Sequence, residues 1–315
     1  MKRTIKSESR PEWLTERAKG IGSSEVAAIL GVSPYQTPYE LWEKKTRDNS
    51  GTSEEDDTNL RFAIGHDLEE RVAATFEAVT GNEIDKGTKG DFVVYDTETP
   101  YMRVSPDRYY TDKETGEKGI LECKTTTRPI DPDSIPMQYF CQVQYQMGVT
   151  GLKKAALAWI DLISTGEGFG GFGYVRIDFD PDFFAFMSAK VKDFWAENVM
   201  KKTPPAPTTA KDAARVYPES KDKAAEVTDE TAGYILKLKD TTAKIKELEA
   251  VANELKDHIT TAFGDAERLA IGNDTWATYK TQHSQRLDTK KLKADHPDIY
   301  EEYCKESTTR VLRIK

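Results

Sequence analysis

The sequence predicts an α/β protein: a central mixed sheet flanked by helices, followed by a long helix with a small β-sheet. Three patterns predict this fold class. Over residues 1–200, segments with the helical period alternate with short segments of strand character, and this order packs most simply as helices on a sheet. Residues 201–228 contain several prolines and lack apolar periodicity. Residues 229–263 then keep one seven-residue apolar repeat.

The first predicted helices have recognisable ends. One begins near Ser23, where apolar residues at helical spacing follow a serine, and Gly31 ends it. A second occupies residues 60–80 and ends at Gly81, a residue type that favours the position just after a helix. The polar stretch 46–59 between them is typical of a loop.

The remaining elements of the first 200 residues complete the sheet and its cover. Strand-like segments are predicted at residues 91–95, 101–104, 119–125, 155–160 and 174–179. The polar, glycine-containing run TDKETGEKG just before the third of them predicts a hairpin turn. Residues 134–150 and 182–199 have the period of helices. Helices before, between and after the strands therefore predict one central mixed sheet.

Composition shifts divide the chain into three parts. Residues 1–200 form one predicted domain, residues 201–228 a semi-rigid proline-rich linker, and residues 229–315 an accessory domain. Residues 1–200 carry 24 basic and 34 acidic side chains, whereas residues 201–315 carry 21 and 20. The acidic first part argues against a passive nucleic-acid coat, which would be basic throughout. It suits carboxylates gathered to hold a metal ion.

The accessory domain is predicted to be one long helix followed by strands. Thr228 can cap the helix, and Gly264 ends it. We call its apolar repeat the heptad seam: Leu238, Thr241, Ile245, Leu248, Ala252, Leu255, Ile259 and Ala262. A hairpin is expected between residues 268–271 and 275–279, and a further strand over residues 307–315.

Cysteine usage and hydropathy indicate a protein of a reducing cytoplasm, with no membrane span. The three cysteines have no CxxC spacing, so neither a disulfide framework nor a four-cysteine zinc site is expected. An iron–sulfur nuclease is excluded for the same reason, because its cluster needs four cysteines. The sequence has no apolar run of the roughly 18–20 residues that a membrane span needs, and its first residues lack the apolar region of a secretory signal.

Two carboxylates stand in positions that invite a functional interpretation. Glu69 shares a helix face with Val72, Ala73 and Phe76, and burying a lone carboxylate is costly unless it has a partner. The alternative is a glutamate at the rim of the core. Asp107 ends a strand in Ser-Pro-Asp, which is equally good turn chemistry.

A third position joins an acid and a base. Glu122 and Lys124 flank Cys123 on a predicted central strand, so they project to one side, while Leu121 and Cys123 face the other. They form either a structural ion pair or a metal ligand beside a group that activates water.

Glutamines on the following helix form a fourth candidate. Gln138 and Gln142 lie one turn apart, with Tyr145 on the same side. Solvent-facing glutamines are the alternative.

In combination these positions resemble the PD-(D/E)xK nuclease site, and the chain resembles the YqaJ-type phage recombinase nucleases, relatives of the lambda-type exonuclease. The matching segments are residues 22–35 (GSSEVAAILGVSPY), 65–69 (GHDLE), 105–107 (SPD), 122–124 (ECK) and 142–145 (QVQY). The resemblance covers roughly residues 11–200 and implies a restriction-endonuclease-like fold. It does not reach the accessory domain.

The resemblance implies a divalent-metal site. Asp107, Glu122 and the backbone carbonyl of Cys123 would hold Mg²⁺, with Mn²⁺ as a possible substitute. Glu69 would hold a second ion or its water, and Lys124 would position the attacking water.

The resemblance also implies a pocket for a terminal 5′-phosphate. Arg17 would form forked bonds to the phosphate, Ser24 lies at a helix N-terminus, and Ser105 and Gln142 would complete the pocket. For Arg17 the alternative is a surface cation. Relatives usually place a small residue after the Ser-Pro-Asp aspartate, where this chain has Arg108, which would contact the substrate or alter the turn.

The expected function is that of a Mg²⁺-dependent 5′-to-3′ exonuclease of double-stranded DNA ends from a phage or prophage. It would leave 3′ single strands for a single-strand annealing protein (RecT- or Beta-like), act in the bacterial cytoplasm and form a ring-shaped homotrimer, all as the resemblance implies. The alternative is a DNA-end binding or scaffolding protein that acts through its C-terminal domain. The heptad seam favours that alternative, and the complete acidic set with its lysine opposes it.

Overall fold

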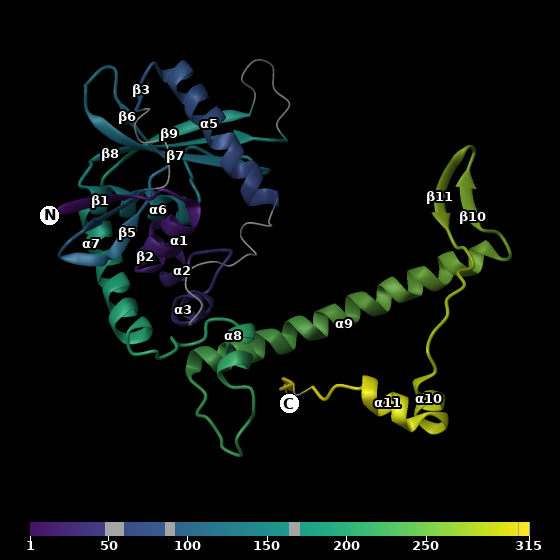
Figure 1. Ribbon diagram of the computed structural model, residues 1–315. Helices are drawn as coiled ribbons and strands as arrows, with labels where there is room; N and C mark the ends of the chain where they lie inside the picture. The colour runs from purple at the N-terminus through teal and green to yellow at the C-terminus, as the bar shows by residue number, and fades with distance from the viewer. Residues whose placement is uncertain (48–59, 86–91, 164–170, 308, 315) are drawn as a thin grey trace. The chain divides into compact units, whose positions relative to one another are not determined.

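The structure is a computed structural model that describes residues 1–47, 60–85, 92–163, 171–307 and 309–314, with the backbone only for residues 60–63. The chain divides into two compact units, Met1–Val216 and Tyr217–Lys315 (Figure 1). Most of the polar stretch predicted as a loop, residues 48–59, lies outside the described residues.

A five-stranded mixed sheet forms the centre of the first unit. Its strands, in spatial order, are β3 (Glu83–Ile84), β6 (Arg108–Thr111), β7 (Lys118–Thr126), β8 (Lys154–Asp161) and β9 (Phe172–Asp178). The central neighbours β7 and β8 are parallel, and the other pairs are antiparallel. The predicted α/β class with a mixed sheet is therefore confirmed. The predicted turn between β6 and β7 is also present, with Gly116 at a positive φ of 70°.

A second sheet corrects the expectation of a single one. Its order is β1 (Lys2–Lys6), β4 (Phe92–Asp96), β5 (Thr99–Val104) and β2 (Ile21–Gly22). The chain leaves this sheet at the end of β5 and enters the central sheet at β6. Pro106 stands at the crossing, and because proline has no N–H to donate, it cannot continue a ladder. The residue that follows this break is Asp107.

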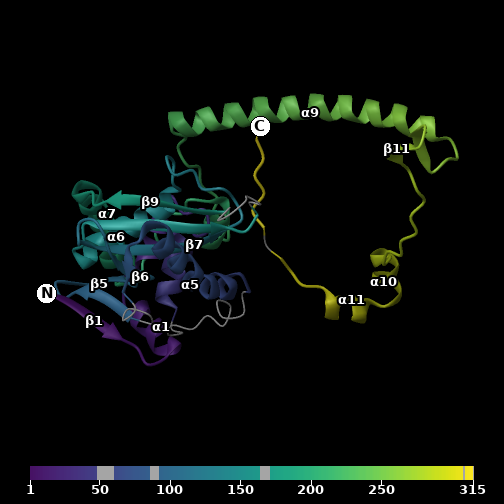
Figure 2. The ribbon, with the colours of Figure 1, turned by 90° about the horizontal axis from the view of Figure 1, so that it is seen from above.

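Helices cover both faces of the central sheet (Figures 1 and 2). Two buried clusters define these faces. Helix α5 (Leu60–Thr80) packs Val72, Ala73 and Phe76 in one cluster with Leu121 and Cys123 of β7. Helix α6 (Met137–Thr150) packs Val143 and Met147 in another cluster with Ile120. The predicted alternation along β7 is thus confirmed, because Leu121 and Cys123 share a face that Ile120 does not.

The ends of these two helices follow from their sequence. Helix α5 stops before Gly81, whose φ of 71° suits glycine. Helix α6 begins at Met137, three residues later than predicted, because Pro136 disfavours helical geometry at the residue before it. Gly151, at φ 84°, ends α6.

Further helices of the first unit pack against the second sheet. They are α1 (Arg10–Ala18), the 3₁₀ turn Ser23–Glu25 with α2 (Val26–Ile29), α3 (Pro38–Thr46), and α7 (Pro181–Asp193), which continues as a π-helix over Phe194–Val199. The predicted helix start at Ser23 and the helix over residues 182–199 are both present. Buried residues of α2, α6 and α7 share one core with β4 and β5.

The stretch predicted as a linker contains a packed helix, α8 (Ala210–Val216). Its contacts with α3 are polar: Asp212 is fully buried and accepts a hydrogen bond from Thr37, and Lys211 pairs with Glu40 at 2.8 Å. Charged and hydroxyl groups thus help to attach this helix, and such contacts leave no apolar period in its sequence. The first unit accordingly extends to Val216.

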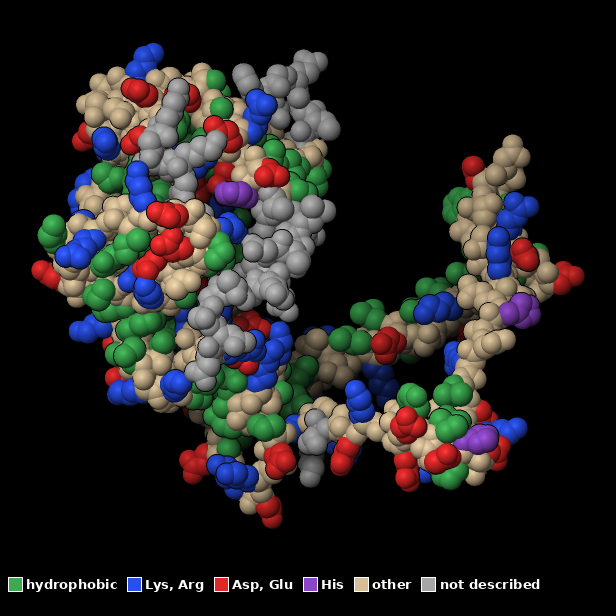
Figure 3. Space-filling model, viewed as in Figure 1, with side chains coloured by type: hydrophobic (Ala, Val, Ile, Leu, Met, Phe, Trp, Pro, Cys, Tyr) green, Lys and Arg blue, Asp and Glu red, His purple; other side chains and the backbone are tan. Residues whose placement is uncertain are grey.

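The second unit contains the predicted long helix. Helix α9 (Asp229–Phe263) is capped by the Thr228 hydroxyl, which accepts a hydrogen bond from the Thr231 N–H at 3.2 Å, and it ends at Gly264. Hydrophobic side chains are visible along the surface of α9 (Figure 3). They include residues of the heptad seam, of which Leu248 is 70% and Leu255 57% exposed. Strands β10 (Arg268–Ile271) and β11 (Asp274–Thr278) form the predicted hairpin.

The end of the chain differs from the prediction. Helices α10 (Thr289–Asp295) and α11 (Pro297–Tyr303) follow the hairpin, and the described residues 307 and 309–314 are not a strand. Val311 and Leu312, which would face opposite sides of a strand, are both at least 70% exposed. A strand needs a paired neighbour and a buried face, and this segment has neither among the described residues.

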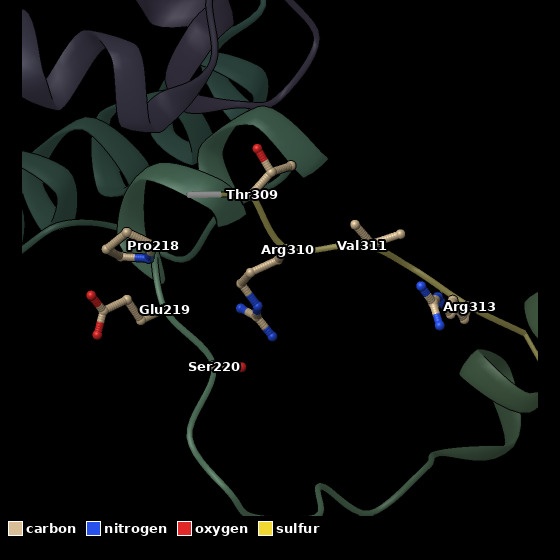
Figure 4. A pocket seen from close by; sticks show the side chains of 7 residues that line it. All are labelled: Pro218, Glu219, Ser220, Thr309, Arg310, Val311 and Arg313. Atoms are coloured by element: carbon tan, nitrogen blue, oxygen red, sulfur yellow. The ribbon is translucent and has the colours of Figure 1, made fainter. Parts of the chain in front are cut away.

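The tail instead lines a hollow within the second unit (Figure 4). The hollow of about 640 Å³ is lined by Pro218, Glu219, Ser220, Thr309, Arg310, Val311 and Arg313. Arg310 extends toward the opposite segment and donates a hydrogen bond to the backbone carbonyl of Tyr217 at 3.3 Å.

The described residues bear on two features that the sequence does not predict, a disulfide framework and a membrane-spanning helix. Cys123 and Cys141 are buried free thiols, and Cys304 is an exposed one, so no disulfide joins them. Within the described ranges, no helix combines the length and apolar character that crossing a bilayer requires.

Candidate active site

The start of β6 and the middle of β7 bring two predicted acids together. The antiparallel register pairs Arg108 with Leu121, so the preceding residue Asp107 stands opposite Glu122. The backbone N–H of Cys123 donates to the Asp107 carboxylate at 2.7 Å. Asp107, which directly precedes β6, and Glu122 on β7 thus lie next to each other on two paired strands.

Glu122 is the centre of a buried hydrogen-bond network. Its side chain is 1% exposed. Lys124 and the Gln142 amide each donate to Oε1 at 2.5 Å, and the Gln146 amide donates to Oε2 at 2.8 Å. Lys124 also donates to the Gln142 carbonyl oxygen at 3.1 Å. Both carboxylate oxygens therefore accept hydrogen bonds, and these bonds offset the cost of burying the charge.

The acids act on one another's ionisation. Burial, followed by the charges of Glu122 and Glu69, raises the pKa of Asp107 well above its ordinary value. For Lys124, burial acts to lower the pKa, but the carboxylates of Glu122 and Asp107 outweigh it and raise that pKa above its usual range. One ammonium thus stands among three carboxylates, a surplus of negative charge that favours a cation.

Glu69 joins this group through its charge. It lies on α5 beside the buried stripe, as predicted, and its carboxylate is 3.4 Å from Nδ1 of His66. Burial raises its pKa; the charge of His66 lowers it, and the charge of Glu122 raises it again. Its side chain is 27% exposed, which also fits the alternative of a glutamate at the rim of the core.

The donor chemistry of this group fits a hard divalent cation. Asp107 and Glu122 supply carboxylate oxygens, and Mg²⁺ prefers such oxygen ligands. The raised pKa of Asp107 marks a carboxylate whose negative charge has too little compensation from its surroundings. Across the described part of the chain, no three His, Cys, Asp or Glu side chains are already closed into a metal-binding group.

The predicted phosphate-binding residues gather around Trp13 of α1. The Arg17 guanidinium lies 4.4 Å from the centre of the Trp13 ring and donates to the Ser24 hydroxyl at 3.3 Å. The Trp13 indole N–H donates to the Ser105 hydroxyl at 3.3 Å. Arg17, Ser24 and Ser105 are thus brought together, while Gln142 lies in the network of Glu122.

A buried ion pair supports the Ser24 segment. Lys45 of α3 lies 2.7 Å from the carboxylate of Glu25, and both side chains are nearly buried. The same carboxylate accepts from the backbone N–H of Gly22 at 2.8 Å, and Lys45 donates to the carbonyl of Gly20 at 2.7 Å. These bonds fix the backbone from Gly20 to Glu25.

Arg108, the unusual residue after Asp107, contacts the backbone of the turn and a glutamate of α5. Its guanidinium donates to the backbone carbonyl of Asp107 at 2.6 Å and lies 3.4 Å from the Glu70 carboxylate. Its residue is 9% exposed. Arg108 thus packs between the turn and α5, and its charge lowers the pKa of Glu69 without being the largest influence on it.

Three residues of the site were not predicted from the sequence. Trp13 connects Arg17 with Ser105, and Tyr139 stacks under Lys124, whose Nζ lies 5.3 Å from the ring centre. Gln146 follows Gln142 by four residues, so the helical period alone would have placed both on one face.

Comparison with known proteins identifies the family. A model of the YqaJ-like viral recombinase domain matches residues 12–153. The uncharacterized protein YqaJ of Bacillus subtilis (strain 168) is 33% identical over 317 residues, covering 98% of this chain and 94% of that protein. The chain belongs to the YqaJ-like viral recombinase family.

Two solved structures align with part of this chain. An alkaline exonuclease (LHK-Exo) from Laribacter hongkongensis aligns with a TM-score of 0.49 and 21% identity over 61% of this chain and 93% of that one. A phage related exonuclease from Haemophilus somnus 129PT aligns with a TM-score of 0.39 and 13% identity, over 58% and 96% of the two chains.

Proposed function

We propose that this protein is a Mg²⁺-dependent exonuclease that degrades double-stranded DNA from its ends in the 5′-to-3′ direction. The observation that carries the proposal is the convergence of Asp107, Glu122 and Lys124 at one point of the central sheet. Membership of a viral recombinase family supports DNA as the substrate. The products would be 3′ single strands for recombination by annealing.

Each residue has a role in this proposal. Asp107, Glu122 and the carbonyl of Cys123 would hold Mg²⁺ or Mn²⁺, with Glu69 holding a second ion or its water. When bound, the cation would neutralise charge on the scissile phosphate. Lys124, whose raised pKa keeps it protonated, would position the attacking water and favour its deprotonation.

The direction of digestion is proposed from the cluster around Trp13. Arg17 and Ser24 offer a guanidinium and a hydroxyl beside the N-terminus of the Ser23–Glu25 turn, and Ser105 lies within reach of the same indole. These groups would bind a terminal 5′-phosphate. Gln142, which bonds Glu122 and Lys124, would complete this pocket.

The direct test uses the purified full-length protein. With Mg²⁺ it should degrade linear duplex that carries 5′-phosphates, release nucleotides from the 5′ ends first, and spare closed circles. Equal cutting of circles would indicate an endonuclease. No cleavage of either DNA with Mg²⁺ or Mn²⁺ would contradict the proposal.

The proposal extends to partners and location. By family resemblance, the enzyme would assemble as a homotrimer around DNA, hand its product to a single-strand annealing protein, and work in the cytoplasm of a bacterial host. The nuclease domain would include residues 1–200, and the accessory domain would be residues 229–315; the stretch 201–228 between them contains α8, which packs with the first unit. Light scattering of the purified protein would test the trimer, and co-purification with a RecT- or Beta-like protein would test the partner.

The exposed heptad seam supports a second candidate function, that of a DNA-end binding or scaffolding protein working through α9. Glu122→Ala separates the two candidates. As an enzyme, the variant should lose cleavage and keep end binding. As a scaffold, the unmodified protein should already bind ends without cleaving them.

A further inference from the structure

Gln146 lies deeper than any other glutamine of the site. It is fully buried on α6, one turn after Gln142, and its neighbours along the helix, Tyr145 and Met147, are buried apolar residues. A position of this kind normally holds an apolar side chain, because an amide in the core must find partners for both of its polar atoms.

The amide of Gln146 reaches two parts of the site at once. Its Nε2 donates to Oε2 of Glu122 at 2.8 Å and lies 3.4 Å from the Ser23 hydroxyl. Oε1 of Glu122 is already held by Lys124 and Gln142. Gln146 is therefore the donor that fixes the second oxygen of this carboxylate.

The other atom of the amide has no such partner. Oε1 of Gln146 is buried and accepts no hydrogen bond from any described residue. A buried oxygen without a hydrogen bond lowers the stability of the fold, and an apolar residue of the same size would avoid this cost. The side chain is thus better suited to holding Glu122 than to packing alone.

We propose that Gln146 is a positioning residue that orients Glu122 for the cation and ties it to the Ser23–Ser24 segment, an inference that rests on the proposed function. An amide is neutral, so it fixes the carboxylate without cancelling the negative charge that attracts a cation. Groups that orient metal ligands in this way typically change metal affinity or activity 10–100-fold when they are replaced.

Gln144 provides a matched control on the same helix. It is 1% exposed, and its amide bonds the backbone carbonyl of Asp178 and the backbone N–H of Asp180, both outside the site. Gln144→Leu and Gln146→Leu therefore remove the same group at similar depth. Only the second removes a bond to Glu122.

The experiment measures Mn²⁺ binding to the full-length protein by titration calorimetry and by the shift in melting temperature that Mn²⁺ produces. Gln146→Leu should weaken Mn²⁺ binding by about 10- to 100-fold. It should shrink the thermal shift accordingly, while Gln144→Leu stays within about twofold of the unmodified protein. If Gln146→Leu does not fold, Gln146→Met, which is unbranched, takes its place.

Three results would overturn the inference or its basis. Unchanged Mn²⁺ affinity in Gln146→Leu or Gln146→Met, with the unmodified protein binding Mn²⁺ and cleaving DNA, would overturn the role of Gln146 alone. Equal weakening in Gln144→Leu would reduce that role to fold stability. Absence of both Mn²⁺ binding and cleavage in the unmodified protein would overturn the proposed function as well.

Discussion

The two units of this protein place their unusual residues in opposite surroundings. In the first unit, polar groups are buried: Glu122, Gln144 and Gln146 are at most 1% exposed. In the second, apolar groups are exposed along α9, where Phe263 is the buried residue of the helix. Both arrangements cost stability, the first by desolvation and the second by leaving apolar area in water.

The two costs in stability have different causes. The buried network of Glu122 is satisfied almost completely from within, so the fold itself accounts for it. Apolar side chains of the heptad seam keep much of their area exposed, and a seam of this pattern is typical of helices that associate. The first unit buries polar groups that have hydrogen-bond partners, and α9 leaves apolar side chains exposed to water.

The largest expected effect follows from removing the charge of Glu122. Glu122→Gln keeps the shape of the side chain but removes the carboxylate, and we expect cleavage of linear duplex to fall by about 10³-fold, as for the loss of a main electrostatic contributor. Quantitative nuclease assays in Mg²⁺ provide the measurement. Activity within tenfold of the unmodified protein would separate Glu122 from the chemistry.

The next effect contrasts the packing of the two units. Leu157 on β8 is fully buried, so Leu157→Ala should lower the free energy of unfolding by about 2–5 kcal/mol. Chemical denaturation of the full-length protein, followed by a signal from the first unit, would measure it. A loss below about 1 kcal/mol would show that the central core is less tightly packed than described.

Arg17→Ala tests the cluster around Trp13. Charge-assisted bonds are worth about 1.5–3 kcal/mol, so the preference for 5′-phosphate over 5′-hydroxyl ends should fall by roughly 10- to 100-fold. Competition binding with the two kinds of duplex measures this preference. Arg3→Ala, on the exposed strand β1, is the control and should leave the preference intact; an equal drop in both variants would point to overall charge.

The smallest effect is expected on α9. Leu248 is 70% exposed, so Leu248→Ala should change the free energy of unfolding by less than about 0.5 kcal/mol. The same substitution thus has a large effect on the free energy of unfolding at Leu157 and almost none at Leu248. A loss above about 2 kcal/mol at Leu248 would mean that the seam is covered in solution, either by another copy or by a partner.

Local patterns predicted most of the elements, whereas Trp13, Tyr139 and Gln146 of the candidate site were missed. The alternation along β7 placed Glu122 and Lys124 together because strand geometry is independent of the rest of the fold. The split into two sheets was not predictable, because strand pairing depends on contacts distant in sequence. Helix α8 was missed because polar groups such as Asp212 attach it, and polar attachment leaves no periodic signal.

Residues whose role depends on contacts with other site residues were the hardest to predict from the sequence. Gln146 shares a face with Gln142, yet a glutamine on a helix is usually exposed, and only its depth reveals its bond to Glu122. Nothing in the sequence around Trp13 indicates its contacts with Arg17 and Ser105, which only the structure shows. Sequence spacing identifies groups on one element, but not the contacts that join elements.

The most direct test of the central claim is a crystal structure of the full-length protein with Mn²⁺ and a short 5′-phosphorylated duplex. Anomalous scattering should place the cation in contact with carboxylate oxygens of both Asp107 and Glu122, at about 2.0–2.3 Å, with Lys124 beside it. A cation bound elsewhere, or a scissile phosphate distant from these two acids, would contradict the claim.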